Sequence, residues 1–164
     1  MEKQQPNQKT RPVLLTVIGI LSFIGLGFRI LTGLINATLG TVTPSITPFL
    51  NDVFENEADL SDVPESLQGF IEGIFDAVIK LLSNVTGIYL IVVLLAVIAL
   101  LGVIMMWQLK KPGFYVYAAS RSLIAFVPFI FIGYNLVSLL WFVSSIVFGI
   151  LFIVLYSLNL KEMS

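Results

Sequence analysis

Two arginines are the ionisable side chains inside the long apolar segments of this sequence. Arg29 and Arg121 each lie in a run of aliphatic and aromatic residues that contains no Asp, Glu or His. A guanidinium stays charged and offers five N–H donors, which suits it to bind a phosphate, a carboxylate or another anion. A charge at mid-membrane costs about 2.5–3.5 kcal/mol on insertion scales, so such a residue is a functional candidate by default.

The position of each arginine also allows a purely structural explanation. Arg29 lies six residues before the predicted outer end of its run, about 9 Å along a helix. Arg121 lies seven residues after the predicted inner start of its run. Long basic side chains can extend toward the nearer interface or cap backbone carbonyls. Both explanations stay open, and Arg29 can also pair with an acid of the segment that follows it.

The residue types that carry most catalytic and metal chemistry are absent. The 164-residue sequence has no Cys and no His, which excludes disulfides, thiolate nucleophiles and histidine bases or ligands. A two-carboxylate site can be drawn among the clustered acids, but solvation explains them and no base or nucleophile pattern supports it. We therefore predict no catalytic residues, no metal and no cofactor, and a protein that is not an enzyme. The sequence has no basic run with interleaved aromatics, so we expect no nucleic-acid partner.

Four long apolar runs predict an integral membrane protein. The sequence is 57% hydrophobic and only 12% charged, whereas ordinary soluble domains are about a quarter charged. A span needs about 20 apolar residues, and the backbone must pair its polar groups internally in hydrocarbon, so the spans are helices. The first run is too long for a typical secretory signal and lacks a convincing cleavage site, so we expect it to be retained. The predicted spans are residues 13–35, 88–107, 114–132 and 136–158.

Basic residues near the span ends predict the orientation. Lys3, Lys9 and Arg11 precede the first run, Lys110-Lys111-Pro112-Gly113 forms a predicted turn between the second and third, and Lys161 follows the fourth. Lys and Arg favour the cytoplasmic side. The predicted fold is thus a four-helix transmembrane bundle, a single membrane domain over residues 1–164 with both termini cytoplasmic. The absence of cysteine favours a bacterial inner membrane over a eukaryotic cell surface.

The segment between the first two spans, about 44–86, is too long and too patterned for a plain connector. Apolar residues recur there at helical spacing in two places, which predicts a hairpin of two amphipathic helices, the second over about 64–84. Whether that helix continues into the next span is left open. Eight of the chain's ten acids lie between Asp52 and Asp76. A mostly acidic polar face is unlike that of lipid-binding helices, so we expect the hairpin to dock on protein. The docking candidates are Phe49, Phe54, Phe70, Ile74, Phe75, Glu65, Glu72 and Asp76.

Small residues at four-residue spacing predict close helix packing. Packing within the bundle is the favoured explanation, with homodimer contacts as the alternative. For the pair in the outer segment, close contact with another helix and chance are about equally good explanations. The pairs are Gly33 with Ala37, Gly69 with Gly73, and Ser145 with Gly149.

Two functions follow from these patterns. The first is a non-enzymatic accessory or scaffold subunit that joins a larger membrane complex through its acidic outer hairpin. The alternative is an oligomeric transport or lipid-handling protein that uses Arg29 and Arg121. The expected partners are the lipid bilayer, other membrane protein subunits and a second copy of the chain.

Overall fold

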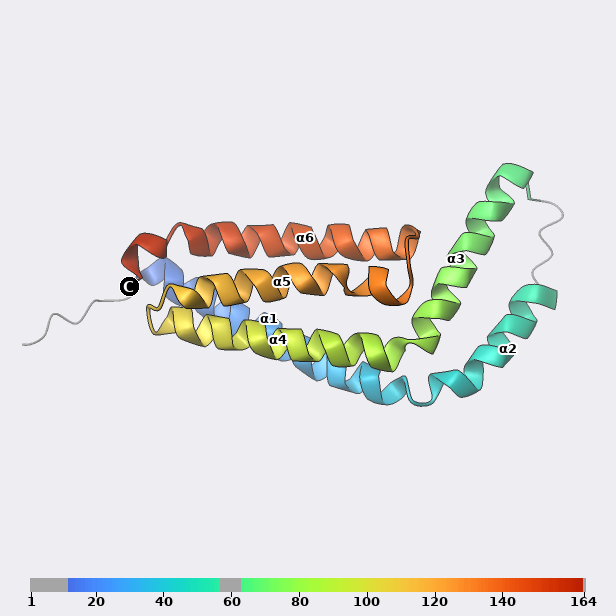
Figure 1. Cartoon of the computed structure of the whole chain (residues 1–164), viewed down its shortest axis with the longest axis horizontal. Coiled ribbons are helices and arrows are strands. Elements are labelled where there is room, and N and C mark those ends of the chain that lie inside the picture. The colour runs from blue at the N-terminus through green and yellow to red at the C-terminus, as the bar shows by residue number, and fades with distance from the viewer. Residues whose placement is uncertain (1–11, 57–62, 164) are drawn as a thin grey trace, which may run out of the picture.

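The computed structural model describes residues 12–56 and 63–163, and within them all regular structure is helical. Figure 1 shows the long helices side by side, with shorter helices that project beyond one end of them. In chain order the elements are α1 (Val13–Leu39), α2 (Thr43–Asn56), α3 (Glu65–Ser83), α4 (Val85–Trp107), α5 (Pro112–Phe131) and α6 (Leu136–Ser157), followed by the 3₁₀ turn η1 (Leu160–Glu162).

The four predicted spans are confirmed as helices, since α1, α4, α5 and α6 are long and apolar enough to cross a membrane. The largest difference is at the end of the first span, which continues to Leu39 instead of ending near residue 35. Asn36 and Thr38 explain the extension, because their side chains donate to the carbonyls of Thr32 at 2.8 Å and Leu34 at 2.9 Å. Polar side chains that bond to their own helix do not end it, although they end the apolar run.

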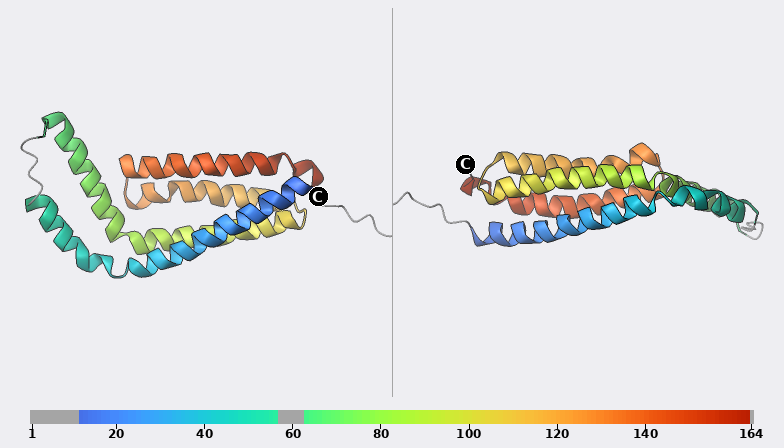
Figure 2. Two further views of the ribbon diagram at one scale, coloured as in Figure 1. Left: turned by 180° about the vertical axis from the view of Figure 1, so that it is seen from behind. Right: turned by 90° about the horizontal axis from the view of Figure 1, so that it is seen from below.

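The four long helices form an incompletely closed bundle. Extensive contacts join α1 to α4, α4 to α5 and α5 to α6, whereas α1 and α6 touch only slightly. The views in Figure 2 show α1 crossing the bundle at an angle to α6. The side between α1 and α6 is therefore the least packed part of the bundle.

The tightest contact is between α4 and α5, where two glycines face each other. A Cβ added to Gly102 would lie 2.8 Å from both the carbonyl oxygen of Gly113 and the amide nitrogen of Tyr117. The prediction that Gly113 belongs to the turn is wrong: α5 begins at Pro112, and Gly113 is a buried helical residue. The chain reverses earlier, at Leu109, whose φ is 61°. Proline at the first helical position explains this start, because its missing N–H costs no bond there.

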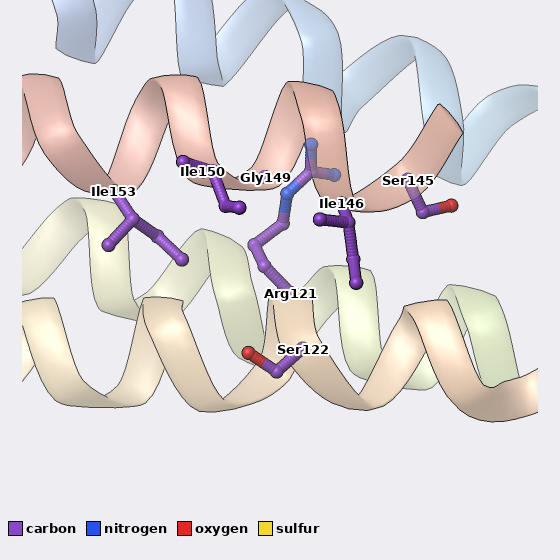
Figure 3. A pocket seen from close by; sticks show the side chains of 7 residues that line it. All are labelled: Arg121, Ser122, Ser145, Ile146, Gly149, Ile150 and Ile153. Atoms are coloured by element: carbon purple, nitrogen blue, oxygen red, sulfur yellow. The ribbon is translucent and has the colours of Figure 1, made fainter. Parts of the chain in front are cut away.

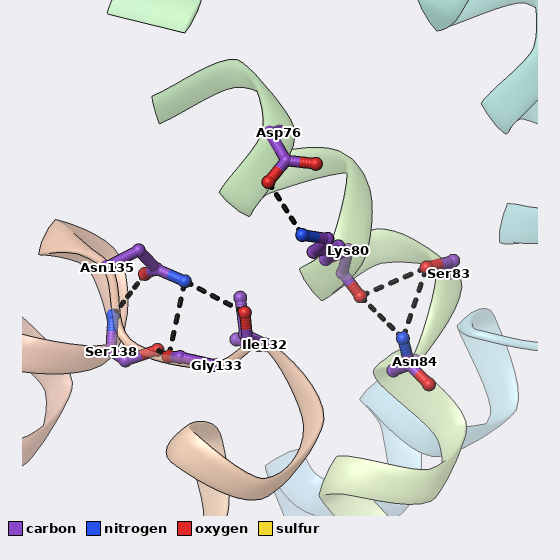
Figure 4. A network of polar contacts seen from close by, with 8 residues as sticks. All are labelled: Asp76, Lys80, Ser83, Asn84, Ile132, Gly133, Asn135 and Ser138. Carbon is purple, nitrogen blue, oxygen red and sulfur yellow. Dashed lines mark hydrogen bonds and ion pairs between the residues drawn. The ribbon is translucent and has the colours of Figure 1, made fainter. Parts of the chain in front are cut away.

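The link between α5 and α6 is a compact polar turn (Figure 4). Gly133 has a φ of 80°, a conformation that glycine adopts without strain. Asn135 caps α6 by accepting from the backbone N–H of Ser138 at 2.9 Å, and it donates back to the carbonyl of Ile132 at 3.0 Å. These bonds satisfy groups that a helix end would leave unpaired.

The helix that precedes α4 does not continue into it. α3 ends at Ser83, and Asn84 leaves helical geometry at φ −109° and ψ 7°. The side-chain amide of Asn84 donates to the carbonyl of Lys80 at 2.9 Å, which pairs one of the last carbonyls of α3 (Figure 4). The question left open by the sequence is thus answered by a break at Asn84.

Candidate functional site

Arg121 extends from the middle of α5 across the bundle. Its side chain points toward α6, where it lies close to Ile146 and Gly149 (Figure 3). It lines a small cavity of about 40 Å³ together with Ser145 and Gly149. It also lines a larger cavity of about 200 Å³, whose other walls come from α1, α5 and α6. We call this larger cavity the α1–α6 groove; it is lined by Leu21, Ser22, Gly25, Leu26, Tyr117, Arg121, Phe148 and Phe152.

Arg29 lies within electrostatic range of the same place. Its charged neighbour is Arg121, and the hydroxyls of Tyr89 and Tyr117 also contribute to its electrostatic environment. An electrostatic interaction therefore acts between the two arginines. None of the groups that act on Arg29 is a carboxylate. The bundle thus holds two like charges near one another, with no acid in the spans to balance them.

A small polar network surrounds the arginines. The buried hydroxyl of Tyr156 donates to Ser22 Oγ at 2.8 Å and lies 3.4 Å from the carbonyl oxygen of Ile18. Tyr117 packs edge-on against Tyr156, with ring centroids 5.2 Å apart, and interacts with both Ser22 and Arg121. This network joins α1, α5 and α6 in the region where helix packing is weakest.

Ser22, Tyr117 and Tyr156 are not among the residues that the sequence singled out. Helical spacing offers a signal for two of them. Ser22 and Arg29 are seven residues apart, and Tyr117 and Arg121 are four apart, so each pair lies on one helical face. No comparable signal in the sequence points to Tyr156, because its position depends on how α6 lies against α1.

The arrangement is suited to anion binding. Arg121 Nε is buried and, within the described residues, has no hydrogen-bond partner. A buried donor without a partner carries a desolvation cost that a ligand can remove. In the described part of the chain, no group of His, Cys, Asp or Glu side chains is placed to hold a metal ion. The groove contains hydroxyls and a guanidinium, but no side chain placed as a general base.

The predicted small-residue positions have different surroundings. A Cβ at Gly33 would lie 2.5 Å from Val93 Cγ2, so α1 and α4 approach closely there. Ala37 is buried next to this contact, and its carbonyl accepts from Thr86 Oγ1 at 3.1 Å. By contrast, a Cβ at Gly149 would meet no atom within 4 Å. Gly33 and Ala37 thus lie in a packed seam, whereas Ser145 and Gly149 line open space beside Arg121.

Most of the predicted docking residues lie on the exposed surfaces of α2 and α3. Phe49 is 66% exposed and Phe70 is 52% exposed, while Ile74 and Phe75 are half-buried. Phe54 belongs to α2, but its side chain falls outside the described part of the structure. The acidic candidates Glu65, Glu72 and Asp76 are all exposed. Asp76 pairs with Lys80 at 2.7 Å (Figure 4).

Gly69 and Gly73 lie beside the end of the bundle. They line a cavity of about 250 Å³ between α3 and the α5–α6 turn, together with Tyr134, Asn135 and Leu136. A Cβ at either glycine would meet no atom within 4 Å. Within the described residues, the two glycines therefore make no close helix contact. Farther along α3, Ala77 is buried in a cluster with Ile88 and Val127 of the bundle.

These helices define the class of the protein. Within the described residues, α1, α4, α5 and α6 are long and apolar enough to cross a membrane, which makes the chain a helical integral membrane protein. Comparison with protein-family models, with curated proteins and with solved structures finds no match.

Proposed function

We propose that this protein is a non-enzymatic accessory or scaffold subunit of a larger membrane complex, which it joins through α2 and α3. The observation that carries the proposal is the exposure of large apolar side chains on helices outside the four spans. Ile46 and Phe49 of α2 are exposed, as are Leu67 and Phe70 of α3. Large apolar side chains that stay exposed outside the membrane spans favour a protein interaction site when they lie together.

The charges of this segment favour protein over lipid as its partner. Its described acids, among them Glu65, Glu72 and Asp76, face solvent. Anionic headgroups repel such a surface, whereas membrane-binding helices are rich in Lys and Arg. In this proposal α2 and α3 form a hairpin of two amphipathic helices whose apolar side chains bury against another subunit.

The orientation belongs to the same proposal. Lys110, Lys111 and Lys161 lie at the end of the bundle opposite α2 and α3 (Figure 1). The enrichment of Lys and Arg on cytoplasmic loops then places both termini in the cytoplasm and α2 and α3 outside. A bacterial inner membrane is the proposed location, with α2 and α3 on its outer side.

Purification in a mild detergent tests the proposal. Tagged protein from native membranes should carry a stoichiometric partner, identified by mass spectrometry. Phe49→Ser and Phe70→Ser together should release that partner while the protein stays folded. The matched control is Phe28→Ser, since Phe28 is 67% exposed on α1 within a span. A lone monomer from the wild type, or a partner retained by the double variant, argues against the docking role.

A second candidate function is an oligomeric transport or lipid-handling protein. It is favoured because Arg121 lines the α1–α6 groove and interacts electrostatically with Arg29. Four helices are few for a solitary pore, so a transport role requires self-association. Reconstituted Arg29→Ala and Arg121→Ala variants should lose flux or lipid transfer between vesicles. Wild-type rates in both variants would exclude this candidate.

A further inference from the structure

We infer that the α1–α6 groove is a binding site for the phosphate group of an anionic phospholipid, which Arg121 and Arg29 hold. This inference deepens the second candidate function by naming its ligand. It does not depend on the docking role of α2 and α3.

Charge is the first argument. The bundle brings two guanidinium groups into electrostatic range, and no carboxylate in the spans offsets them. A phosphate offers several oxygens to the planar N–H groups of arginine and often binds them in a bidentate way. It also gives a partner to Arg121 Nε, which is buried and unpaired within the described residues. Two cations within electrostatic range, with no acid in the spans, are thus explained by an anion that binds both of them.

The walls of the groove distinguish a lipid from a free ion. Leu21 and Leu26 come from α1, and Phe148 and Phe152 come from α6. Both helices belong to the candidate spans, and their contact with each other is slight. The groove is therefore bordered by side chains that suit acyl chains, next to the polar group formed by Ser22, Tyr117 and Arg121. A phospholipid matches both halves of this surface, whereas inorganic phosphate matches only the polar half.

The depth of Arg121 along α5 is compatible with a bound phospholipid phosphate. Arg121 lies nine residues after Pro112, about 14 Å along α5. Arginine at such a depth is accommodated by local thinning of the bilayer and by water that enters around it. In the groove, the same deformation lets a headgroup phosphate move in along α1 and α6. Arg29, one helical turn beyond Gly25, lies on the same face of α1 as Ser22 and meets the phosphate from that side.

Two glycines keep the space open. A Cβ at Gly25 or at Gly149 would meet no atom within 4 Å, and both residues line cavities that Arg121 also lines. A larger side chain at Gly25 can thus occupy the groove without forcing helices apart. Gly27 supplies a matched control, because its Cβ would also meet nothing within 4 Å and it does not line the groove.

Native mass spectrometry of the purified full chain in detergent tests the inference. Phosphatidylglycerol should bind at least about tenfold more tightly than phosphatidylcholine, a factor worth about 1.4 kcal/mol. Arg121→Gln and Gly25→Leu should each remove most of that preference, whereas Gly27→Leu should leave it unchanged. Arg121→Lys keeps the charge but loses the planar N–H pair, so it should bind with intermediate strength. Circular dichroism checks that each variant is folded.

Three results would overturn the site. The first is equal retention of the two lipids, and the second is undiminished preference in both Arg121→Gln and Gly25→Leu. The third is displacement of phosphatidylglycerol by millimolar inorganic phosphate, which would make the ligand a soluble anion. Failure of lipid transfer in vesicles, with the lipid preference intact, would reject only the lipid-handling function. Absence of the preference for phosphatidylglycerol, with lipid transfer between vesicles intact, would reject only the binding site in the α1–α6 groove.

Discussion

The α4–α5 seam and the α1–α6 groove use the same residue type in opposite ways. In the seam, Gly102 and Gly113 let two backbones touch, and a methyl group on either would meet backbone atoms. Gly25 in the groove and Gly149 in the small cavity beside Arg121 have open space where their side chains would be. A glycine in a membrane helix is thus informative only with its surroundings: one pair closes the bundle, and the other keeps part of it open.

The two regions also differ in the side chains that join their helices. Preceding Gly102 on α4, Ala96 and Ala99 are small buried side chains in one apolar cluster with Tyr117 of α5. On the groove side, Tyr156 and Ser22 join α6 to α1 by a hydrogen bond of 2.8 Å. Packing of small residues therefore holds the seam, whereas a buried polar contact adds to apolar packing beside the groove. The substitutions below separate these two sources of stability, from the largest expected effect to the smallest.

Gly102→Leu should destabilise the protein most. The added side chain has backbone atoms of α5 at 2.8 Å from its Cβ, so the helices must separate. Overpacking of this kind costs about 3 kcal/mol at the upper end of its usual range. Thermal unfolding in detergent, followed by circular dichroism, measures the loss. Gly27→Leu is the control and should unfold near the wild-type temperature. Equal stability of the two variants would mean that the seam is not close-packed.

Tyr156→Phe should have the next largest effect. It removes the hydroxyl that donates to Ser22 and keeps the ring that packs on Tyr117. A buried hydrogen bond contributes about 1 kcal/mol, and those between membrane helices average somewhat less. A double-mutant cycle with Ser22→Ala isolates the contact, because both single variants and the double variant should lose similar stability. Strictly additive losses would show that the bond does not join α1 to α6.

The seam and the groove were not equally visible in the sequence. Apolar length predicted the four spans because burial in lipid needs only that property. The spacing of Ala96, Ala99 and Gly102 did carry a signal for the seam, although the pattern Lys110-Lys111-Pro112-Gly113 drew attention to a turn instead. Arg29 and Arg121 are recognised from the sequence by residue type, but the electrostatic interaction between them is not. That interaction depends on how α1 crosses the bundle, a tertiary property that no local pattern records.

Gly149→Ala should stabilise the protein slightly, in contrast to Gly102→Ala. The new methyl group enters open space beside Arg121, and alanine is a better helix former than glycine by about 0.5–1 kcal/mol. The same substitution at Gly102 places a Cβ against backbone and should lower the unfolding temperature. Measured side by side, the two alanine variants should shift that temperature in opposite directions. A loss of stability in Gly149→Ala would show that the small cavity beside Arg121 is packed rather than open.

Asp76→Asn should have the smallest effect on stability, because the ion pair of Asp76 is exposed to solvent on α3 and lies outside the four-helix bundle. Asp76 and Lys80 lie 2.7 Å apart on one face of α3, and both are exposed. An exposed i, i+4 ion pair contributes about 0.3–0.5 kcal/mol and is screened by salt. The stability difference between wild type and Asp76→Asn should therefore vanish in about 1 M salt, where the Debye length is roughly 3 Å. In the Lys80→Gln background, Asp76→Asn should cost nothing further.

The Tyr156→Phe loss should persist at the same salt concentration, since that contact is buried and uncharged. If salt removed the stability loss of Tyr156→Phe, water would have to reach the contact between Tyr156 and Ser22. The distinction between a solvated ion pair on α3 and a protected hydrogen bond at Ser22 would then be wrong.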